Sequence, residues 1–476
     1  MNKLIVSVII FLFFSMSHSA TAQTFMSGAC PVSYSPDKEI RAVWLATIGG
    51  IDWPRTYAST PATILRQKQE LTDMLDKLKK ININTILLQT RVRGTVIYPS
   101  MYEPWDGCMS GKPGVSPGYD PLRFAIEECH KRGMEIHAWV VTIPVGKWNN
   151  LGCRRLRQRY PKLITKIGDE GFMHPEQQQT ADYLSDICCE IIQNYNIDGI
   201  HLDYIRYPET WKNRINRVQG REYITRIVRK IHNDIKQKKP SVKISCSPLG
   251  KHDDLSRYSS RGWNARNTVC QDAQAWLRNG LMDQLYPMIY FKENNFYPFA
   301  IDWAEHSAAG QVAAGLGIYF LDPKEGNWRI DEVKRQLNVC RQLGLGQCFF
   351  RAKYLINNIQ GLYDYLRIFN FQIPKKDEIK EQNSGISALV SQKPTGPIPY
   401  LTTNQGHLTM PERHDGQDAD MLLITSLAGN GITTKKWSGK TLDVSNLKPG
   451  TYIIYSLNRR GSTHRMAYLR VEEDIK

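Results

Sequence analysis

The sequence predicts an α/β protein: a (β/α)8 TIM barrel followed by a small all-β sandwich. Short apolar runs alternate with amphipathic helical patterns across residues 40–370, which is typical of a parallel sheet with crossover helices. There are eight such runs, the number that closes this kind of barrel. Beyond residue 385 the pattern changes to short alternating stretches separated by Gly, Pro and Asn, which favours the sandwich.

The predicted strands are runs rich in aliphatic residues and bounded by turn residues. They are Arg41–Ile48, Thr85–Arg91, Glu135–Thr142, Gly199–Ile205, Lys243–Pro248, Gln284–Phe291, Ala314–Leu321 and Gly346–Arg351. No glycine-rich phosphate loop follows the first strand, which disfavours the alternative of an open doubly wound sheet.

Start and stop signals mark the first two predicted helices. Thr60-Pro61 and Asp120-Pro121 each combine an N-cap residue with proline in the first turn, and Gly133 ends the second helix. Six further helical patterns follow near residues 184–195, 224–235, 272–279, 301–309, 331–343 and 359–369. Each strand is therefore followed by a helix.

The N-terminus has the features of an export signal. Lys3 precedes the apolar run Leu4–Phe14, and Ala20-Thr21-Ala22 fits a cleavage site, so we expect residues 1–22 to be removed. An uncut anchor and a lipoprotein at Cys30 are the alternatives. No later stretch reaches about 18 apolar residues, so we expect no transmembrane span after signal removal. The predicted domains are a barrel at residues 38–374, a linker at 375–384 and an accessory sandwich at 385–476.

The composition bears on partners and compartment. Among 476 residues, 62 Lys and Arg oppose 46 Asp and Glu, which gives a net charge of +16. This excess of positive charge indicates either a solvated basic surface or a surface that attracts an anionic partner. For an exported protein, an acidic glycan is a better candidate partner than nucleic acid. We expect the protein in the periplasm or at the cell surface, associated with the outer membrane.

The ten cysteines show no spacing typical of zinc sites, so we expect no metal and no other cofactor. Most of them occupy positions in the pattern that are typical of small apolar residues, which indicates free thiols buried in the hydrophobic core. Cys108 and Cys153 fall in long predicted loops, where a disulfide is the alternative.

Candidate site residues follow from the position of active sites in such barrels, at the C-terminal ends of the strands. Side chains alternate between the two faces of a strand. In the fourth strand Ile200, Leu202 and Tyr204 should face the helices, whereas His201, Asp203 and Ile205 should point into the barrel.

The same alternation directs further polar and aromatic side chains toward one mouth. They are Gln89, Arg91, His137, Trp139, Gln284, Tyr286 and Tyr290. For Trp44 and Trp139 the alternative to a binding role is packing in the core. For His201 it is a buried histidine whose hydrogen bonds are made within the core, and for Arg91 it is a structural ion pair. Aromatic residues in the predicted loops suit sugar faces or merely anchor those loops: Trp53, Tyr102, Trp105, Trp148 and Trp211.

Asp203 is the clearest catalytic candidate, because a carboxylate at the rim beside Arg and Tyr suits acid/base chemistry. Glycoside cleavage normally needs a second carboxylate. Glu293 lies two residues after the sixth strand and Asp322 one residue after the seventh, so their reach is restricted. Asp203 would protonate the leaving oxygen, with Glu293 or Asp322 as nucleophile or base.

Substrate binding is expected from Trp44, Gln89, Arg91, Trp139, His201, Arg206 and Tyr290, with Arg91, Arg206 and Tyr290 holding ring substituents. A metal-dependent deacetylase that uses His201 and Asp203 is a weaker alternative, because no further histidine has matching spacing.

Ordered motifs across residues 40–370 resemble the glycosyl-hydrolase-like family ten, exported glycosidases related to a bacterial enzyme that cleaves peptide-free peptidoglycan strands. The longest is Asp198–Pro208, which reads DGIHLDYIRYP. The others are Arg41–Thr47, Ile51–Pro54, Gln89–Arg91, Tyr98–Ser100, Glu103–Trp105, Gly118–Leu122, His130–Gly133, His137–Trp139, Ser247–Gly250 and Trp276–Leu277. The resemblance implies a (β/α)8 glycosidase acting on a polysaccharide, with peptidoglycan as the leading candidate. It also implies an immunoglobulin- or fibronectin-like type for the C-terminal sandwich, because such proteins often carry a tail of this kind.

The chain departs from the family pattern at two places on the predicted mouth. Many relatives read Asn-Pro-Tyr-Arg after the tryptophan at 139, where this chain has Val140–Pro144. Relatives tend to read Pro-Gln-x-Tyr-Trp in the sixth strand, where this chain has Pro287–Phe291. These departures motivate the alternative function, a catalytically inactive glycan-binding protein on the same barrel.

Overall fold

The computed structural model describes most of the barrel region and parts of the C-terminal region. The described residues are 39–211, 216–255, 260, 262–292, 295–371, 400–403, 407–409, 419–426, 432–437, 441–458 and 463–471. The predicted signal segment 1–22, the linker 375–384 and the candidate acid Glu293 lie outside them.

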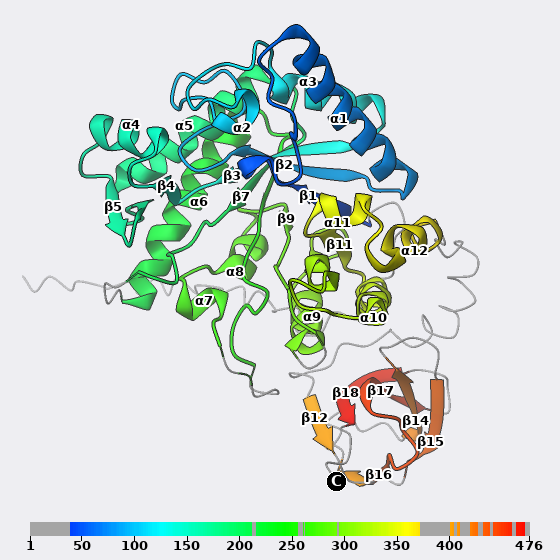
Figure 1. Ribbon diagram of the computed structural model, residues 1–476. Helices are drawn as coiled ribbons and strands as arrows, with labels where there is room; N and C mark the ends of the chain where they lie inside the picture. The colour runs from blue at the N-terminus through cyan, green and yellow to red at the C-terminus, as the bar shows by residue number, and fades with distance from the viewer. Residues whose placement is uncertain are drawn as a thin grey trace, which may run out of the picture.

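An eight-stranded parallel sheet forms the centre of the molecule (Figure 1), in the order β10-β11-β1-β2-β3-β7-β8-β9. Isolated parallel bridges from Leu285 to Val312 and from Met288 to Gly315 join its two edges. The sheet is therefore a nearly closed barrel, as predicted. The strands are β1 (Arg41–Leu45), β2 (Thr85–Arg91), β3 (Glu135–Val141), β7 (Gly199–Asp203), β8 (Lys243–Cys246), β9 (Gln284–Leu285), β10 (Ala313–Leu316) and β11 (Gly346–Phe349).

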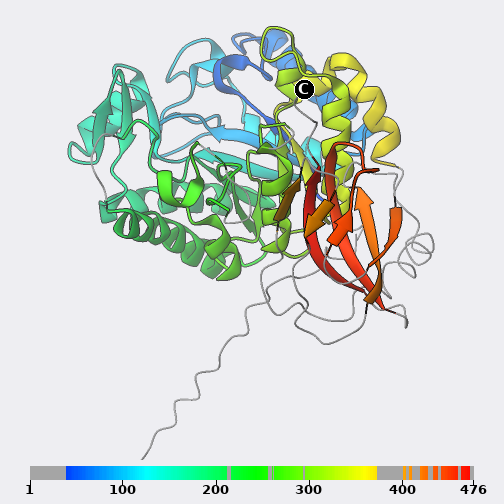
Figure 2. The ribbon, with the colours of Figure 1, turned by 90° about the horizontal axis from the view of Figure 1, so that it is seen from below.

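Helices surround this sheet, and α5 and α6 pack against each other on one side of it (Figures 1 and 2). The longer helices are α1 (Pro61–Lys80), α3 (Pro121–Lys131), α5 (Gln178–Asn194), α6 (Arg217–Lys238), α8 (Ala273–Arg278), α9 (Tyr297–Glu305), α10 (Ile330–Gln342) and α12 (Leu362–Phe369). The shorter ones are α2 (Gly107–Ser110), α7 (Ala265–Thr268), α11 (Ala352–Ile356) and the 3-10 turns η2 (Ile48–Gly50), η4 (Ile318–Leu321) and η5 (Ile359–Gly361).

Local capping explains where the first helices begin. Thr60 and Thr63 form a reciprocal capping box at the start of α1, and the Asp120 carboxylate accepts the backbone N–H of Arg123 at the start of α3. Each cap satisfies backbone donors that the first helical turn leaves unpaired. The sequence signals at Thr60-Pro61 and Asp120-Pro121 therefore mark real helix starts.

Two separate cores follow from the alternation of side chains along the strands. In β1, Val43 and Leu45 join the core between the sheet and the helices. Ala42, Trp44 and Ala46 join a second core inside the barrel. The barrel interior is thus filled by side chains, and only its C-terminal rim is left for a site.

Some predicted strands are shorter in the structure, because the chain turns early at the rim. The sixth strand ends at Leu285, although Tyr286–Phe291 was expected to continue it. The seventh ends at Leu316, and Ile318–Leu321 forms a 3-10 turn because the backbone of Gly317 leaves the extended conformation. More rim residues are therefore available to loops than the sequence suggested.

A small excursion between β3 and α5 was not predicted. It comprises β4 (Pro144–Lys147), α4 (Leu151–Arg159), β5 (Ile164–Ile167) and β6 (Glu170–Met173). The three strands form an antiparallel sheet in the order β4-β6-β5. The excursion follows the C-terminal end of β3, so it stands beside the barrel mouth.

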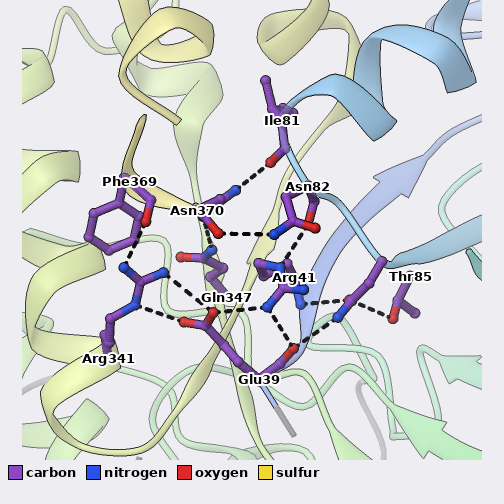
Figure 3. A network of polar contacts seen from close by, with 10 residues as sticks. Glu39, Arg41, Ile81, Asn82, Thr85, Arg341, Gln347, Phe369 and Asn370 are labelled. Atoms are coloured by element: carbon purple, nitrogen blue, oxygen red, sulfur yellow. Dashed lines mark hydrogen bonds and ion pairs between the residues drawn. The ribbon is translucent and has the colours of Figure 1, made fainter. Parts of the chain in front are cut away.

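A polar network closes the opposite end of the barrel (Figure 3). The Glu39 carboxylate accepts hydrogen bonds from Arg41 and from Arg341, each at 3.0 Å. The Asn370 side chain accepts from Gln347 at 2.6 Å and donates to a backbone carbonyl after α1. These contacts join the first strand to the last strand–helix unit, which is a stabilising role typical of this end of the fold.

The described C-terminal residues form strands only. They are β12 (Tyr400–Thr403), β13 (His407–Thr409), β14 (Ala419–Ser426), β15 (Ile432–Lys436), β16 (Thr441–Asp443), β17 (Gly450–Asn458) and β18 (Thr463–Val471). Five of them form the sheet β12-β18-β17-β14-β15, and β13 pairs with β16. These strands are drawn in orange to red in Figure 2. Leu422, Ile454 and Leu469 belong to their core. The immunoglobulin or fibronectin type of this region stays a prediction.

The cysteines of the described residues are free, buried thiols. Cys108 and Cys153 are among them, so the alternative of a disulfide between the two is not realised. Of the helices that the structure describes, none has the length and apolar character needed to span a bilayer.

Candidate active site

Asp203 lies at the C-terminal end of β7, at the rim of the barrel. Its Oδ2 accepts the indole N–H of Trp139 at 3.0 Å, and its Oδ1 accepts the hydroxyl of Ser247 at 2.7 Å. The backbone N–H of Tyr204 donates to Oδ1 at 2.8 Å. The residue is 7% exposed. All three contacts use the Asp203 carboxylate as the acceptor, so three donors fix its orientation at the mouth.

Tyr204 reverses the alternation that was predicted for the fourth strand. Its φ of 53° places it in the left-handed region, which ends the strand. As a result, Tyr204 packs against the inner core, whereas Ile205 belongs to the outer core between sheet and helices. The predicted directions of these two side chains were therefore wrong, and those of Ile200 and Leu202 are confirmed.

Arg206 lies directly beside Tyr204. Its guanidinium carbon is 4.1 Å from the centre of the Tyr204 ring, and it forms an ion pair with Glu209 at 3.1 Å. Its Nη1 is buried and has no hydrogen-bond partner among the described residues. A buried charged donor without a partner is costly, so this atom is suited to an incoming acceptor.

Tyr290 supplies a second such donor. Its hydroxyl is buried and, within the described part of the chain, makes no hydrogen bond. The ring contacts Trp44 and Phe350 at centroid distances of 6.3 and 5.4 Å. Burial raises the pKa of this phenol well above its usual value, and the charge of Asp203 raises it further. Tyr290 is therefore a neutral donor within electrostatic reach of Asp203.

His201 lies one layer below Asp203 and is fully buried. Its Nε2 accepts the indole N–H of Trp44 at 3.2 Å, which leaves the proton on Nδ1, 3.0 Å from the hydroxyl of Ser245. Burial lowers the pKa of the imidazole well below 6.5. Trp44 and His201 thus form a neutral aromatic floor under the mouth. Both nitrogens of His201 are occupied, which argues against the deacetylase alternative.

Gln89 and Arg91 shape the rim from β2. The Gln89 side-chain oxygen accepts the backbone N–H groups of Thr47 and Ile48 at 3.0 and 2.8 Å, so it holds the turn after β1. Arg91 is fully buried and pairs with Glu103 at 2.7 Å. Glu103 also accepts from Tyr183 of α5 at 2.9 Å. The structure therefore separates Arg91 from the group around Asp203.

Of the two other expected acids, Asp322 lies in the described residues, and its carboxylate contacts the backbone of its own turn. Asp322 is partly exposed, and its carboxylate accepts the backbone N–H of Lys324 at 3.0 Å within its own turn after η4. Glu293 lies outside the described residues, three positions beyond Tyr290 in the chain. The identity of the second acid thus stays a prediction.

Several loop aromatics are anchors. The Trp53 indole is fully buried and donates to the Gln67 carbonyl at 2.9 Å. The face of Trp148 is covered by Arg157, 3.8 Å from the ring centre. Tyr102 and Trp211 pack against the main core. For these residues the anchoring interpretation accounts for the contacts.

Ser247 contacts Asp203 but was not among the site residues predicted from the sequence. Alternation along the fifth strand places Ser245 and Ser247 on the same face, so the signal was present in the pattern. Asp52 was also missed as a rim residue: its carboxylate accepts from Arg351 at 2.7 Å and from the backbone N–H of Ala46 at 2.9 Å. Asp52 joins the loops after the first and last strands. Burial raises its pKa.

Comparisons with known proteins identify relatives of this chain. The family model described as Glycosyl hydrolase-like 10 matches residues 39–219 and 215–320, which include every contact of Asp203. The chain belongs to the glycosyl hydrolase-like 10 family. This family member thus has a glycoside hydrolase-type fold.

Curated relatives of this family member carry the same kind of name. It is 29% identical to the glycosyl hydrolase YngK of Bacillus subtilis (strain 168) over 369 residues, covering 69% of this chain and 71% of the relative. It is 30% identical to the glycosyl hydrolase DigH of Escherichia coli (strain K12) over 367 residues, covering 66% of this chain and 83% of the relative.

Solved structures also match this family member, at low similarity. An α-L-fucosidase isoenzyme 2 from Paenibacillus thiaminolyticus matches with a TM-score of 0.45 and 12% identity, covering 76% of this chain and 52% of that one. A maltogenic α-amylase, AmyB, from Thermotoga neapolitana matches with a TM-score of 0.46 and 8% identity, covering 91% and 99%.

Among the described residues, the structure contains no group of three or more His, Cys, Asp or Glu side chains arranged to hold a metal ion. The candidate site consists of an oriented carboxylate, two unsatisfied donors and an aromatic floor.

Proposed function

We propose that the protein is an exported glycoside hydrolase that cleaves O-glycosidic bonds of a polysaccharide, with peptidoglycan glycan strands as the first candidate substrate. The observation that carries the proposal is the Asp203 carboxylate, held by three donors at the barrel mouth. Membership of the glycosyl hydrolase-like 10 family supports the reaction class.

The hydrogen bonds favour one division of labour between the two acids. Trp139, Ser247 and the backbone of Tyr204 all donate to Asp203, so their contacts are best made to the charged form. We therefore propose Asp203 as the nucleophile or as the base for water, in place of the proton donor that the sequence suggested. Glu293 is then the leading candidate for the proton donor, and Asp322 the alternative.

The remaining site residues divide into donors and supports. Arg206 Nη1 and Tyr290 Oη are the groups proposed to bind sugar oxygens, because both are buried donors without partners in the described residues. Trp44, His201 and Gln89 support the rim from below. Arg91 is left out of the proposed site, since Glu103 already satisfies it.

The reaction is tested by incubating the purified protein with peptide-free peptidoglycan strands and with a panel of plant and host glycans. Mass spectrometry of the products identifies any cleaved linkage. New reducing ends from at least one glycan support the hydrolase. Saturable binding of a glycan without new ends supports the inactive binding protein, which the residues Val140–Pro144 and Pro287–Phe291 motivate.

Export is a separate proposal. It rests on the apolar run Leu4–Phe14 and the small residues Ala20-Thr21-Ala22. N-terminal sequencing of the protein isolated from its native cells is expected to begin at Gln23, with the protein in the periplasmic or outer-membrane fraction. An intact Met1 in a cytoplasmic fraction would contradict export.

A further inference from the structure

A cleft of about 600 Å³ lies beside the barrel mouth. One wall comes from the segments that follow β1 and β2, including Ile48 and Arg93. The opposite wall comes from the excursion β4–α4–β5–β6, including Lys147 and Arg154. This volume is within the range of about 300–1,000 Å³ that is usual for small-molecule sites, so it is large enough for one sugar unit.

The acidic side chains that line the cleft have partners within the protein, whereas one basic side chain has no ion-pair partner among the described residues. Of the two acids that line the cleft, Asp106 caps α2 and accepts the Thr95 hydroxyl at 2.6 Å, and Glu170 pairs with Arg93 at 2.9 Å. Arg154 is exposed, and its side chain forms no ion pair within the part of the chain that the structure describes. The acids are therefore engaged, while a cationic side chain is available to an incoming anion.

The excursion as a whole is strongly basic. Between residues 144 and 173 it carries seven Lys and Arg against two Asp and Glu. Several of these cations have protein partners: Arg157 stacks on Trp148, and Lys147 lies 3.7 Å from Asp169 with both side chains exposed. The start of α4 at Leu151 and Gly152 also lines the cleft and contributes the positive end of the helix dipole.

Arg93, in the wall of the cleft, lies two residues beyond the C-terminal end of β2 at Arg91. Burial raises the pKa of the Tyr204 phenol, but the positive charges of Arg206 and Arg93 act in the opposite direction. Arg93 is therefore within electrostatic reach of Tyr204, whose backbone N–H binds Asp203.

We propose that this cleft is a subsite that binds the carboxylate of an acidic sugar within the glycan strand, with Arg154, Arg93 and Lys147 as the cationic groups. The inference rests on the proposed function and adds a chemical class to its substrate. A strand that carries a carboxylate near the cleaved bond should bind more tightly than the same strand without that charge.

The test measures binding and turnover separately, on two matched ligands. The ligands are short peptide-free peptidoglycan strands, which carry lactyl carboxylates, and the same strands after chemical reduction of the carboxylates to alcohols. Hyaluronan oligosaccharides, whose carboxylates belong to a uronic acid, form a second arm. Binding is measured by calorimetry with the full-length Asp203→Asn variant, so that hydrolysis does not consume the strands.

Four variants, made in both the Asp203→Asn and the wild-type background, give the expected pattern. Arg154→Ala and Arg93→Ala should each weaken binding of the native strands roughly three- to tenfold and leave the reduced strands nearly unaffected. Arg155→Ala, on the same helix but outside the cleft lining, is the matched control and should leave both unchanged. Glu170→Gln removes a negative charge from the cleft and releases Arg93, so binding of the native strands should become tighter.

The outcomes separate this inference from the proposed function. Equal binding of native and reduced strands, or no effect of Arg154→Ala and Glu170→Gln on either carboxylate-bearing glycan, would overturn the subsite even if the wild type cleaves the strands. Carboxylate-dependent binding that responds to both variants supports the subsite even if no glycan is cleaved. If only hyaluronan shows the dependence, the subsite stands with a uronic acid as its sugar.

Discussion

The indole Nε1 of Trp139 on β3 donates a hydrogen bond of 3.0 Å to Oδ2 of Asp203 on the neighbouring strand β7. The two strands pair in parallel, with Trp139 opposite His201 and Val141 opposite Asp203. The indole therefore reaches diagonally toward the rim and fixes the carboxylate from one side, while Ser247, directly after β8, fixes it from the other. Three adjacent strand ends thus determine the direction of a single acid.

Removal of the serine donor should reduce turnover more than stability. In Ser247→Ala, Asp203 loses a charge-assisted hydrogen bond, and kcat should fall roughly 10- to 100-fold. Ser245→Ala is the matched control, because Ser245 is two positions earlier on the same face and contacts His201 instead of Asp203. Kinetics on the cleaved glycan provide the measurement. Equal effects of the two substitutions on kcat would mean that Ser247 has no specific role.

Tyr290→Phe should separate binding from folding. The hydroxyl has no hydrogen-bond partner among the described residues, so its loss should leave Tm unchanged or slightly higher. If the hydroxyl donates to the sugar, KM should rise roughly five- to tenfold. Thermal unfolding and initial rates measured on the same preparation check both expectations. A lower Tm with an unchanged KM would assign the hydroxyl to the fold.

The barrel could be predicted because each strand carries a complete local signal. Thr85–Arg91 has the predicted bounds, and the alternation at Val43, Trp44 and Leu45 assigns each side chain to the correct core. The direction of Asp203 followed from the same rule. Short-range periodicity was sufficient here because each strand has one face inside the barrel and one against the helices.

The rim was harder to predict, because long-range contacts decide it. A tyrosine at positive φ is uncommon, so nothing in the local pattern indicated that Tyr204 would turn inward. Glu103 pairs with Arg91 across a loop, which removes that arginine from the mouth. The excursion β4–α4–β5–β6 interrupts a strand–helix unit with short elements whose periodicity is too brief to recognise.

Acid should destabilise the protein through His201. Its folded-state pKa lies below the unfolded value of 6.5, so the unfolded chain binds an extra proton as pH falls through that value. The stability is therefore fully present above about pH 6.5 and is lost at up to about 1.4 kcal/mol per pH unit on the way down to the folded pKa. Denaturant unfolding of the wild type and of His201→Gln between pH 7.5 and 5 gives the slope of the free energy of unfolding against pH for each protein. Parallel slopes would contradict the assignment.

The buried pair of Arg91 and Glu103 should dominate local stability. Arg91→Met leaves a buried carboxylate without its cation, which typically costs about 3–5 kcal/mol. The double variant Arg91→Met/Glu103→Leu should recover part of that loss, because no unpaired charge remains. Chemical denaturation of the three proteins provides the comparison. If the double variant is less stable than Arg91→Met, so that none of the loss is recovered, the result would argue against coupling between the two side chains.

Release of reducing ends by wild type, Asp203→Asn and Asp198→Asn from the same glycan tests the central claim most directly. Asp198 precedes the same strand at its opposite end, where it binds His130 at 2.8 Å, so it controls for the loss of a carboxylate. We expect Asp203→Asn to lower turnover on the order of 10²- to 10⁴-fold, with Asp198→Asn within a few-fold of wild type. Wild-type turnover in a folded Asp203→Asn protein would contradict the mechanism.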